Sequence, residues 1–429
     1  VGAVCSGYSD RRVPVGYGDR PSHYWALGIT TIVTVAIDPG VTFAVVGQKL
    51  FSSADNFAML AVPGFFLAGD IMTAGGLSKK LVEFADSLVG WVTGGISLVA
   101  IVSCAFFAAI SGSSAATTAA IGGIMYPEMI KRGYPSDYST AVQAVGGTLG
   151  IIIPPSIVFV IYGSTNGVSI SKLLISGMLP GILTAIALCI YGYLVAKKAN
   201  FPKSFQDFSI KRVLKSLKGA IWALMMPLII LGGIYGGIFT PTESAMVACA
   251  YGLVVSFFVT RELTVKNFLD VVSKTAASTA NVTVMFLAAQ VFGFLIAYYD
   301  ITTTIANFFV AVSPNWIIFM ALVFFLLVIT GMFMEVGATN VILSPLLAPV
   351  AAAFGIDPIH FGMVFVFLLA LGQATPPFGS TMFIACGISG ERVAAVIKRL
   401  LPFVLVEYAC ALVFTYVPWF STFLPNLMT

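Results

Sequence analysis

Long apolar stretches, separated by short polar breaks, run along almost the whole chain from about residue 25 to residue 424. Because one membrane-spanning helix needs about 20 predominantly apolar residues, this pattern predicts an all-α polytopic membrane protein with about 10–12 membrane segments. Several stretches are too long, or too often interrupted by Gly and Pro, for one straight helix. The stretches cover approximately residues 25–50, 56–75, 95–131, 138–165, 173–196, 220–260, 279–299, 314–355, 358–390 and 400–424.

Composition narrows the class of protein further. Of the 429 residues, 59% are apolar and 9% are charged, whereas a soluble domain carries about 25% charged residues. These values exclude a water-soluble enzyme, a nucleic-acid-binding protein and a secreted disulfide scaffold. The six cysteines have no metal-binding spacing, so we expect no transition metal.

The basic residues predict the orientation of the chain in the membrane. Residues 197–218 contain seven Lys or Arg and one acid, Asp207, so the positive-inside rule makes this loop cytoplasmic. From Thr275 to Glu391 there is no Lys or Arg, although this region must cross the membrane at least four times. For Arg392 to return to the cytoplasm, one of the long apolar stretches must form a re-entrant hairpin.

Two parts of the chain show the same order of structural features. In each, an apolar helix meets a small polar tip, a second helix follows, and a third helix is interrupted by Gly and a Pro-Pro pair. We call the tips tip 1 (SGSSA, residues 111–115) and tip 2 (EVGATN, residues 335–340). The interruptions are break 1 (GGTLGIIIPP, residues 146–155) and break 2 (GQATPP, residues 372–377). Since Pro removes a backbone donor, each break frees carbonyl groups that only protein or a polar cavity can satisfy at membrane depth.

The flanking charges indicate that the two repeats are inverted. Lys79, Lys80, Lys131 and Arg132 bracket the first hairpin, which therefore enters from the cytoplasm, whereas no base brackets the second. Inverted repeats with discontinuous helices that meet near the midplane are typical of secondary transporters, whose ion and substrate sites lie between the repeats.

Hydroxyl and amide side chains beside free carbonyls are oxygen ligands suited to an alkali cation, and helix N-termini suit an anion. We predict one Na⁺ between each tip and the break of its own repeat, with the substrate between the two tips. The side-chain candidates are Ser111, Ser113, Ser114, Thr148, Thr339, Asn340, Gln373 and Thr375.

Other interpretations stay open at this stage. Asp70 and Glu335 lie among apolar residues. Each could carry a proton, bind a cation or have a purely structural role. A channel could use the same tips and breaks, and a membrane protease would need a Ser-His pair, for which only His360 is placed within the apolar region. Glu243 is expected to cap the helix that follows, together with Thr240 or Thr242.

Two charged segments, residues 77–91 and 261–275, have apolar residues near helical spacing and are predicted to be interfacial amphipathic helices, with ordinary polar loops as the alternative. In the second segment the apolar positions are Leu263, Phe268, Leu269 and Val272. Residues 1–24 form a polar leader without the continuous apolar region of a signal peptide.

Five strings together resemble the large membrane subunit (DctM type) of TRAP transporters, the tripartite ATP-independent periplasmic carriers. They are QKLFSSADNFAMLAVPGFFLAGDIM, ISGSSAATTAAIGGIMYPEMIKRGYP, GGTLGIIIPPSIVFVIYG followed by NGVSISKL, GGIYGGIFTPTESA, and LALGQATPPFGSTMF. The resemblance implies a Na⁺-driven elevator-type carrier of organic acids, C4-dicarboxylates or sialic acid, in the bacterial inner membrane, with no organic cofactor. It also implies two partners, a small four-helix membrane subunit and a periplasmic substrate-binding protein. Overall likeness slightly favours sialic acid members (SiaM-like).

In the family, the tips and broken helices form the sites, and the resemblance carries these roles over to matching positions here. The implied Na⁺-binding residues are Ser111, Gly112, Ser113, Ser114, Gly146, Gly147, Thr148, Gly337, Thr339, Asn340, Gly372, Gln373, Ala374 and Thr375. The implied substrate-binding residues are Ser113, Ser114, Pro154, Pro155, Asn340, Pro376 and Pro377. The start departs from the family, because Val13 and the residues after it follow a polar leader instead of an apolar helix.

These predictions divide the chain into seven regions. Repeat 1 with its broken helix covers residues 95–172, and repeat 2 with its broken helix covers residues 314–390. The other regions are the leader (1–24), scaffold helices with the first arm (25–94), scaffold helices with the basic loop and second arm (173–278), a scaffold helix with its connection (279–313), and a C-terminal scaffold helix (391–429).

Overall fold

The computed structural model describes residues 23–38, 40–203 and 207–428, and the regular structure of these residues is entirely helical. The polar leader lies outside the described residues except for its last two, His23 and Tyr24, which begin the first helix. Seven helical stretches are long and apolar enough to cross a membrane, and two bent helix pairs bring this number to nine. The shorter apolar helices α5, α17 and α18 supply the remaining segments, which confirms the predicted polytopic all-α class.

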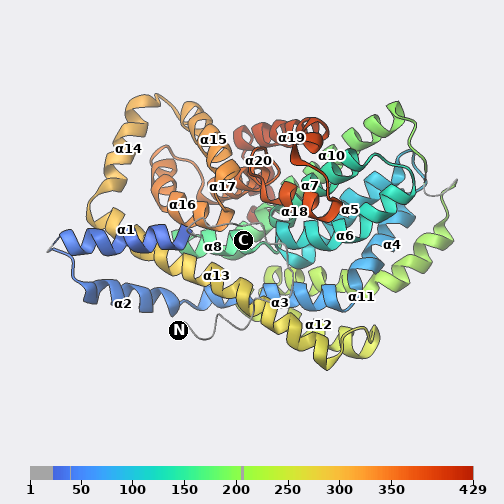
Figure 1. Cartoon of the computed structure of the whole chain (residues 1–429). Helices are drawn as coiled ribbons and strands as arrows, with labels where there is room; N and C mark the ends of the chain where they lie inside the picture. Colours follow the sequence, from blue (N-terminus) through green and yellow to red (C-terminus); the bar gives the residue numbers. More distant parts are fainter. Residues whose placement is uncertain (1–22, 39, 204–206, 429) are drawn as a thin grey trace.

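One group of helices contains the two repeats. The first repeat has a hairpin of α5 (Gly95–Ser111) and α6 (Ser114–Lys131), followed by α7 (Ser136–Ile152) and α8 (Ile157–Asn166) on either side of the Pro-Pro pair of break 1. The second has a hairpin of α15 (Trp316–Phe333) and α16 (Val336–Ala353), followed by α17 (Pro358–Gly372) and α18 (Ser380–Ser389) around break 2. The two hairpins and the two broken helices are therefore confirmed (Figure 1).

Other helices form a layer around the repeats (Figure 1). In chain order they are α1 (His23–Ile37), α2 (Phe43–Ala54), a 3-10 turn (Phe57–Leu60), α3 (Ala61–Ala74), α4 (Leu77–Val89), α11 (Ile210–Tyr235), α12 (Pro241–Val254) with a π-helical end (Val255–Val259), α13 (Val265–Tyr298) and α14 (Ile301–Val312). Within this layer α12 packs on α3 and α11, α11 on α4, and α13 on α1, α2 and α3.

The helices that follow the broken helices pack with the repeats. These are α9 (Ile170–Ser176), α10 (Met178–Lys198), α19 (Val393–Tyr416) and α20 (Trp419–Asn426). Both α10 and α19 lie against α7 and against each other, although the sequence grouped them with the scaffold. The C-terminal apolar segment is also bent, by 62° between α19 and α20.

The two predicted amphipathic segments are helical. Helix α4 buries Leu77, Leu81 and Ala85 and exposes the Lys80–Glu83 ion pair, so the alternative of an ordinary loop is wrong. The second segment is the first part of α13, which continues without interruption for 34 residues across the boundary expected at residue 279. At 1.5 Å per residue this helix is about 50 Å long, which exceeds the roughly 30 Å hydrocarbon core of a bilayer.

The apolar positions predicted for the second segment divide between two environments, since Leu263 and Phe268 pack inward whereas Leu269 and Val272 are exposed. Leu263, which precedes α13, and Val271 are buried against Ile71, whereas Leu269 is 63% exposed. The expected connection after α13 also contains a further helix, α14. Because α14 is rich in Thr, Ile, Val and Phe, which have low helix propensity, its packing on α13 and α16 rather than propensity accounts for its order.

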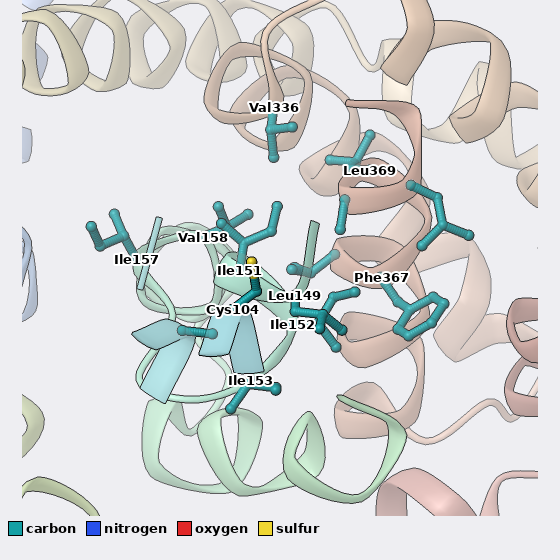
Figure 2. Close-up of a cluster of buried hydrophobic side chains, with 14 of the residues drawn as sticks. Cys104, Leu149, Ile151, Ile152, Ile153, Ile157, Val158, Val336, Phe367 and Leu369 are labelled. Atoms are coloured by element: carbon teal, nitrogen blue, oxygen red, sulfur yellow. The ribbon is translucent and has the colours of Figure 1, made fainter. Parts of the chain in front are cut away.

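Most buried apolar residues form one continuous core, which includes the residues on both sides of break 1. Figure 2 shows Ile151, Ile152 and Val158, from the end of α7 and the start of α8, beside Leu369 of α17 and Val336 of tip 2. The two repeats therefore share a core, and break 1 of the first repeat lies where it packs against the second.

Candidate functional site

The two tips are built by the same capping geometry. In tip 1 the side chain of Ser113 caps α6, and the backbone carbonyl of Ser113 accepts a hydrogen bond from Thr117 Oγ1 at 2.8 Å. In tip 2 the carboxylate of Glu335 caps α16, and the backbone carbonyl of Glu335 accepts a hydrogen bond from Thr339 Oγ1 at 3.0 Å. Glu335 thus has the structural role that the sequence left open beside a functional one. Both helices direct the positive end of their dipole toward the tip.

Tip 1 packs directly on break 1. The carbonyl of Gly112 accepts a hydrogen bond from Ile157 N at 3.3 Å. Gly112 has φ +60°, and a Cβ at this position would lie 2.5 Å from Pro155 O. One turn before the Pro-Pro pair, a Cβ at Gly150 would lie 2.5 Å from Ser113 O. These two glycines therefore allow the backbones of the tip and the break to meet with no side chain between them.

Three oxygen atoms gather at this contact. Ser111 Oγ lies 2.9 Å from Thr117 Oγ1 and 3.4 Å from Ser113 O, and all three residues are buried or half-buried. Hydroxyl and carbonyl oxygens are hard ligands that suit an alkali cation. The sequence did not single out Thr117, although its place four residues after the cap, equivalent to that of Thr339, was a readable signal.

Break 2 is also closed by glycine contacts. A Cβ at Gly372 would lie 2.5 Å from the carbonyl carbon of Gly331, so α17 and α15 touch backbone to backbone. Beyond Gly372 the chain turns, and the carbonyl of Gln373 accepts hydrogen bonds from both N and Oγ1 of Thr381, at 3.0 and 2.9 Å. Ala374 is fully buried within this turn. The Pro-Pro peptide bond is cis in both breaks.

The predicted polar residues pair across the repeats. Ser114 Oγ of tip 1 donates a hydrogen bond to Gln373 Oε1 of break 2. Asn340 Nδ2 of tip 2 donates one to Val158 O, just after break 1, at 3.0 Å. The helices also pack across the repeats, since α6 lies against α18 and α16 against α8. The structure therefore brings tip 1, tip 2 and both breaks together, but no hydrogen bond joins the side chains of tip 2 to those of break 2 in the described part of the chain.

Asn340 has an unused acceptor. Its side chain is 0% exposed, and its Oδ1 has no hydrogen-bond partner among the described residues. An unsatisfied buried acceptor costs about 1–3 kcal/mol, so this oxygen is suited to a cation or to a donor on a bound molecule. Among the described residues no group of three His, Cys, Asp or Glu side chains could hold a metal ion.

Two other predicted ligands face away from the tips. Thr148 Oγ1 lies 2.5 Å from Glu407 Oε1, and Thr375 Oγ1 lies 2.8 Å from Tyr408 Oη. Two consecutive residues of α19 thus hold one threonine from each broken helix. The sequence interpretation missed Glu407, which is 0% exposed, although an acid in the apolar string VLVEYAC was a visible signal.

The predicted glycines of α7 and tip 2 permit close helix packing. A Cβ at Gly146 would lie 2.9 Å from Cys104 Sγ of α5, and one at Gly147 would lie 1.8 Å from Thr118 Oγ1 of α6. A Cβ at Gly337 would lie 2.5 Å from the side chain of Met285 on α13. These glycines set the spacing of the hairpins against α7 and α13.

The remaining predicted residues have structural partners. Asp70 forms an ion pair with Lys274 at 3.0 Å and accepts a hydrogen bond from Thr275 Oγ1, which joins α3 to α13. His360 Nδ1 lies 2.8 Å from Ser421 Oγ and Nε2 lies 3.2 Å from Thr415 O, so both ring nitrogens have partners other than the serines of tip 1. Thr240 and Glu243 form a capping box at the start of α12, which confirms the predicted cap with Thr240.

Hairpins, broken helices and polar tips enclosed in an apolar core are typical of membrane transporters. Comparison with known proteins then identifies the family. Residues 20–420 match the family model of the tripartite ATP-independent periplasmic transporter, DctM component, so the chain belongs to the DctM family.

Relatives with assigned names are similar over most of the chain. It is 41% identical over 392 residues to the isethionate TRAP transporter permease protein DctMQ of Oleidesulfovibrio alaskensis, covering 91% of this chain and 62% of that protein. It is 37% identical over 425 residues to the C4-dicarboxylate TRAP transporter large permease protein DctM of Vibrio cholerae, covering 94% of this chain and 93% of that protein. The chain thus spans less than two thirds of the isethionate relative and nearly all of the other.

A solved structure shares the fold. The YdaH transporter of Alcanivorax borkumensis, whose structure is described as having an unusual topology, superposes with a TM-score of 0.66 at 16% identity. The match covers 94% of this chain and 97% of that one.

Proposed function

We propose that this chain is the large membrane subunit of a TRAP system that imports an organic acid, driven by a Na⁺ gradient, across the bacterial inner membrane. The observation that carries the proposal is the crossing of the repeats, in which Ser114 meets Gln373 and Asn340 meets Val158 O. Family membership supports the tripartite character, and the relatives named for isethionate and C4-dicarboxylate support a small organic anion.

The oxygen atoms suggest where Na⁺ would bind as a co-substrate. One ion fits beside Ser111 Oγ, Ser113 O and Thr117 Oγ1, and a second fits beside the free Oδ1 of Asn340. The sequence hypothesis placed each ion between the tip and the break of one repeat, and the geometry supports this for repeat 1. For repeat 2, the proposal changes to an ion held where tip 2 meets the segment after break 1.

The organic acid would lie between the tips. No Lys or Arg occurs from Thr275 to Glu391, so hydroxyl groups, amides and helix N-termini would bind the carboxylate. Ser114 and Gln373 would supply a hydroxyl and an amide to the carboxylate. Apolar walls would come from Pro154, Pro155, Pro376 and Pro377. Such contacts are weak individually, which favours rapid release.

Helix packing supports an elevator mechanism. The proposed moving body contains α5–α10 and α15–α20, because α10 and α19 pack on α7. The outer layer of α3, α11, α12 and α13 would stay fixed, with α4 and the first part of α13 as arms. A small membrane subunit would widen this layer, and a periplasmic binding protein would deliver the substrate.

Transport in proteoliposomes tests the proposal. With an inward Na⁺ gradient, we expect uptake of isethionate, a C4-dicarboxylate or sialic acid only when the binding protein and the small subunit are present. Uptake without the binding protein would contradict the tripartite assignment. Uptake at channel rates, or uptake that is unchanged when K⁺ replaces Na⁺, would contradict a Na⁺-coupled carrier.

Cysteine labelling tests the orientation. A cysteine at Lys215, which is exposed near the start of α11, should react with a membrane-impermeant maleimide only from the cytoplasmic side. On the outer side Ser313 is only 1% exposed, so the adjacent exposed Pro314 is the suitable position. A cysteine at Pro314 should react only from the outside. Labelling of both positions from one side would overturn the topology.

A further inference from the structure

A basic pocket lies outside the tips, where α7, α10 and α19 meet. Its volume is about 420 Å³. Three bases lie around it, Lys198 at the end of α10 and Lys398 and Arg399 near the start of α19. Tyr138, Tyr191, Val195, Pro402 and Phe403 form the rest of its wall, together with Ala199.

The three bases are only partly neutralised. Arg399 Nε lies 3.1 Å from Asp137 Oδ2. No carboxylate of the described residues forms an ion pair with Lys198 or Lys398. Like charges that converge on one pocket repel each other, so an anion bound between them would relieve this repulsion.

The pocket changes from polar to apolar along the helix axes. On α19 the bases at 398 and 399 precede Phe403 by about one turn, and on α10 Tyr191 precedes Lys198 by about two turns. The deep wall is aromatic, since the Tyr191 and Phe403 rings meet edge to face at 4.7 Å and Tyr138 is 1% exposed. This gradient matches a lipid, with its phosphate among the bases and its glycerol and upper acyl chain below. A soluble anion would gain nothing from the apolar part.

The position of the pocket also agrees with a lipid. Lys198 is the second residue of the basic segment 197–218, which the charge rule places in the cytoplasm. The loops before α7 and after α10 lie together, because Tyr134 Oη donates a hydrogen bond to Pro202 O at 3.1 Å. Bases between membrane helices at the cytoplasmic interface are suited to anionic lipid headgroups.

We propose that this pocket binds the headgroup phosphate of an anionic phospholipid from the cytoplasmic leaflet, with Lys198 and Lys398 as the main ligands. The site is independent of the tips and of the transported substrate. Since α7, α10 and α19 belong to one packed group, the bound lipid would travel with these helices.

Thermal unfolding and native mass spectrometry of the purified full-length chain test this proposal. Phosphatidylglycerol should raise the unfolding temperature and give a resolved one-lipid complex, whereas phosphatidylcholine with the same acyl chains should not. The double variant Lys198→Ala/Lys398→Ala should bind phosphatidylglycerol at least about tenfold more weakly. The matched control is Lys203→Ala/Lys211→Ala, which removes two exposed bases near the same end of the molecule but outside the pocket and should bind like the wild type.

Three results would overturn the proposal. Inorganic phosphate that stabilises the protein as much as phosphatidylglycerol would identify a site for soluble anions. Equal stabilisation by phosphatidylcholine would indicate general lipid binding. Unchanged lipid affinity in the Lys198/Lys398 variant, with intact folding, would exclude these bases as ligands. None of these outcomes depends on Na⁺-driven uptake, so the proposal and the proposed transport function fail separately.

Discussion

Replacing Asn340 with alanine is expected to lower Na⁺-dependent uptake at least about tenfold. The substitution removes the free Oδ1 and leaves Val158 O without its hydrogen bond in a fully buried position. Loss of one partner from a buried hydrogen bond costs about 1–3 kcal/mol, and about 1.4 kcal/mol is a factor of ten in binding. Initial uptake rates at varied Na⁺ concentration would measure the effect, with the amount of protein in the membrane as normalisation.

The chain offers a matched control for this variant. Asn166 Nδ2 donates to Ser344 Oγ at 2.8 Å, so it also joins α8 to α16, but at the opposite end of α8 from break 1. Asn166→Ala should change the Na⁺ dependence less than twofold. If both variants lose uptake equally, the role of Asn340 is general packing of α8 on α16. If Asn340→Ala keeps its Na⁺ dependence, a cation does not bind there.

Replacing Gly112 with alanine is expected to reduce uptake more than tenfold. A non-glycine residue at φ +60° is strained by about 1–2 kcal/mol, and the added Cβ would lie 2.5 Å from Pro155 O. Because both the tip and the break are backbone at this point, no flexible side chain can move aside. The contact of tip 1 with break 1 must open, and because Gly112 joins α5 to α6, Ser111 Oγ would shift relative to Ser113 O and Thr117 Oγ1.

Gly167→Ala separates strain from steric contact. Gly167 also has a left-handed backbone, with φ +67°, but nothing lies within 4 Å of an added Cβ. We expect a modest loss of thermal stability from the strain alone and uptake within twofold of the wild type. Equal losses in the Gly112 and Gly167 variants would show that close approach at tip 1 is unimportant.

The interrupted helices, hairpins and helix caps could be predicted from the sequence because each depends on local chemistry. Gly followed by Pro-Pro interrupts a helix wherever it occurs, and a small polar string between two apolar helices produces a hairpin. For the same reason the cap of α12 by Thr240 and Glu243 was predictable. The residues of both tips lie where this local reasoning placed them.

Contacts between distant elements could not be read in the same way. The sequence assigned Gln373 to the second repeat, and nothing local indicates that its side chain reaches Ser114 of the first. The continuity of α13 was hidden because its first turns are charged and its later turns apolar, although no Gly or Pro separates them. The apolar setting of Glu407 was visible, but its partner Thr148 follows only from the packing of α19 on α7.

The crossed pairs have a consequence for the synthesis of the chain. Ser114 and Gln373 are 259 residues apart, as are Thr148 and Glu407. At about 5–20 residues per second, a ribosome needs roughly 13 to 52 s to add that length. During this time the first hairpin is already made, while the side chains that complete its polar groups do not yet exist. Until break 2 and α19 are made, Ser114 Oγ and Thr148 Oγ1 must therefore rely on water or on nearby backbone carbonyls, as Thr148 Oγ1 can with Val145 O.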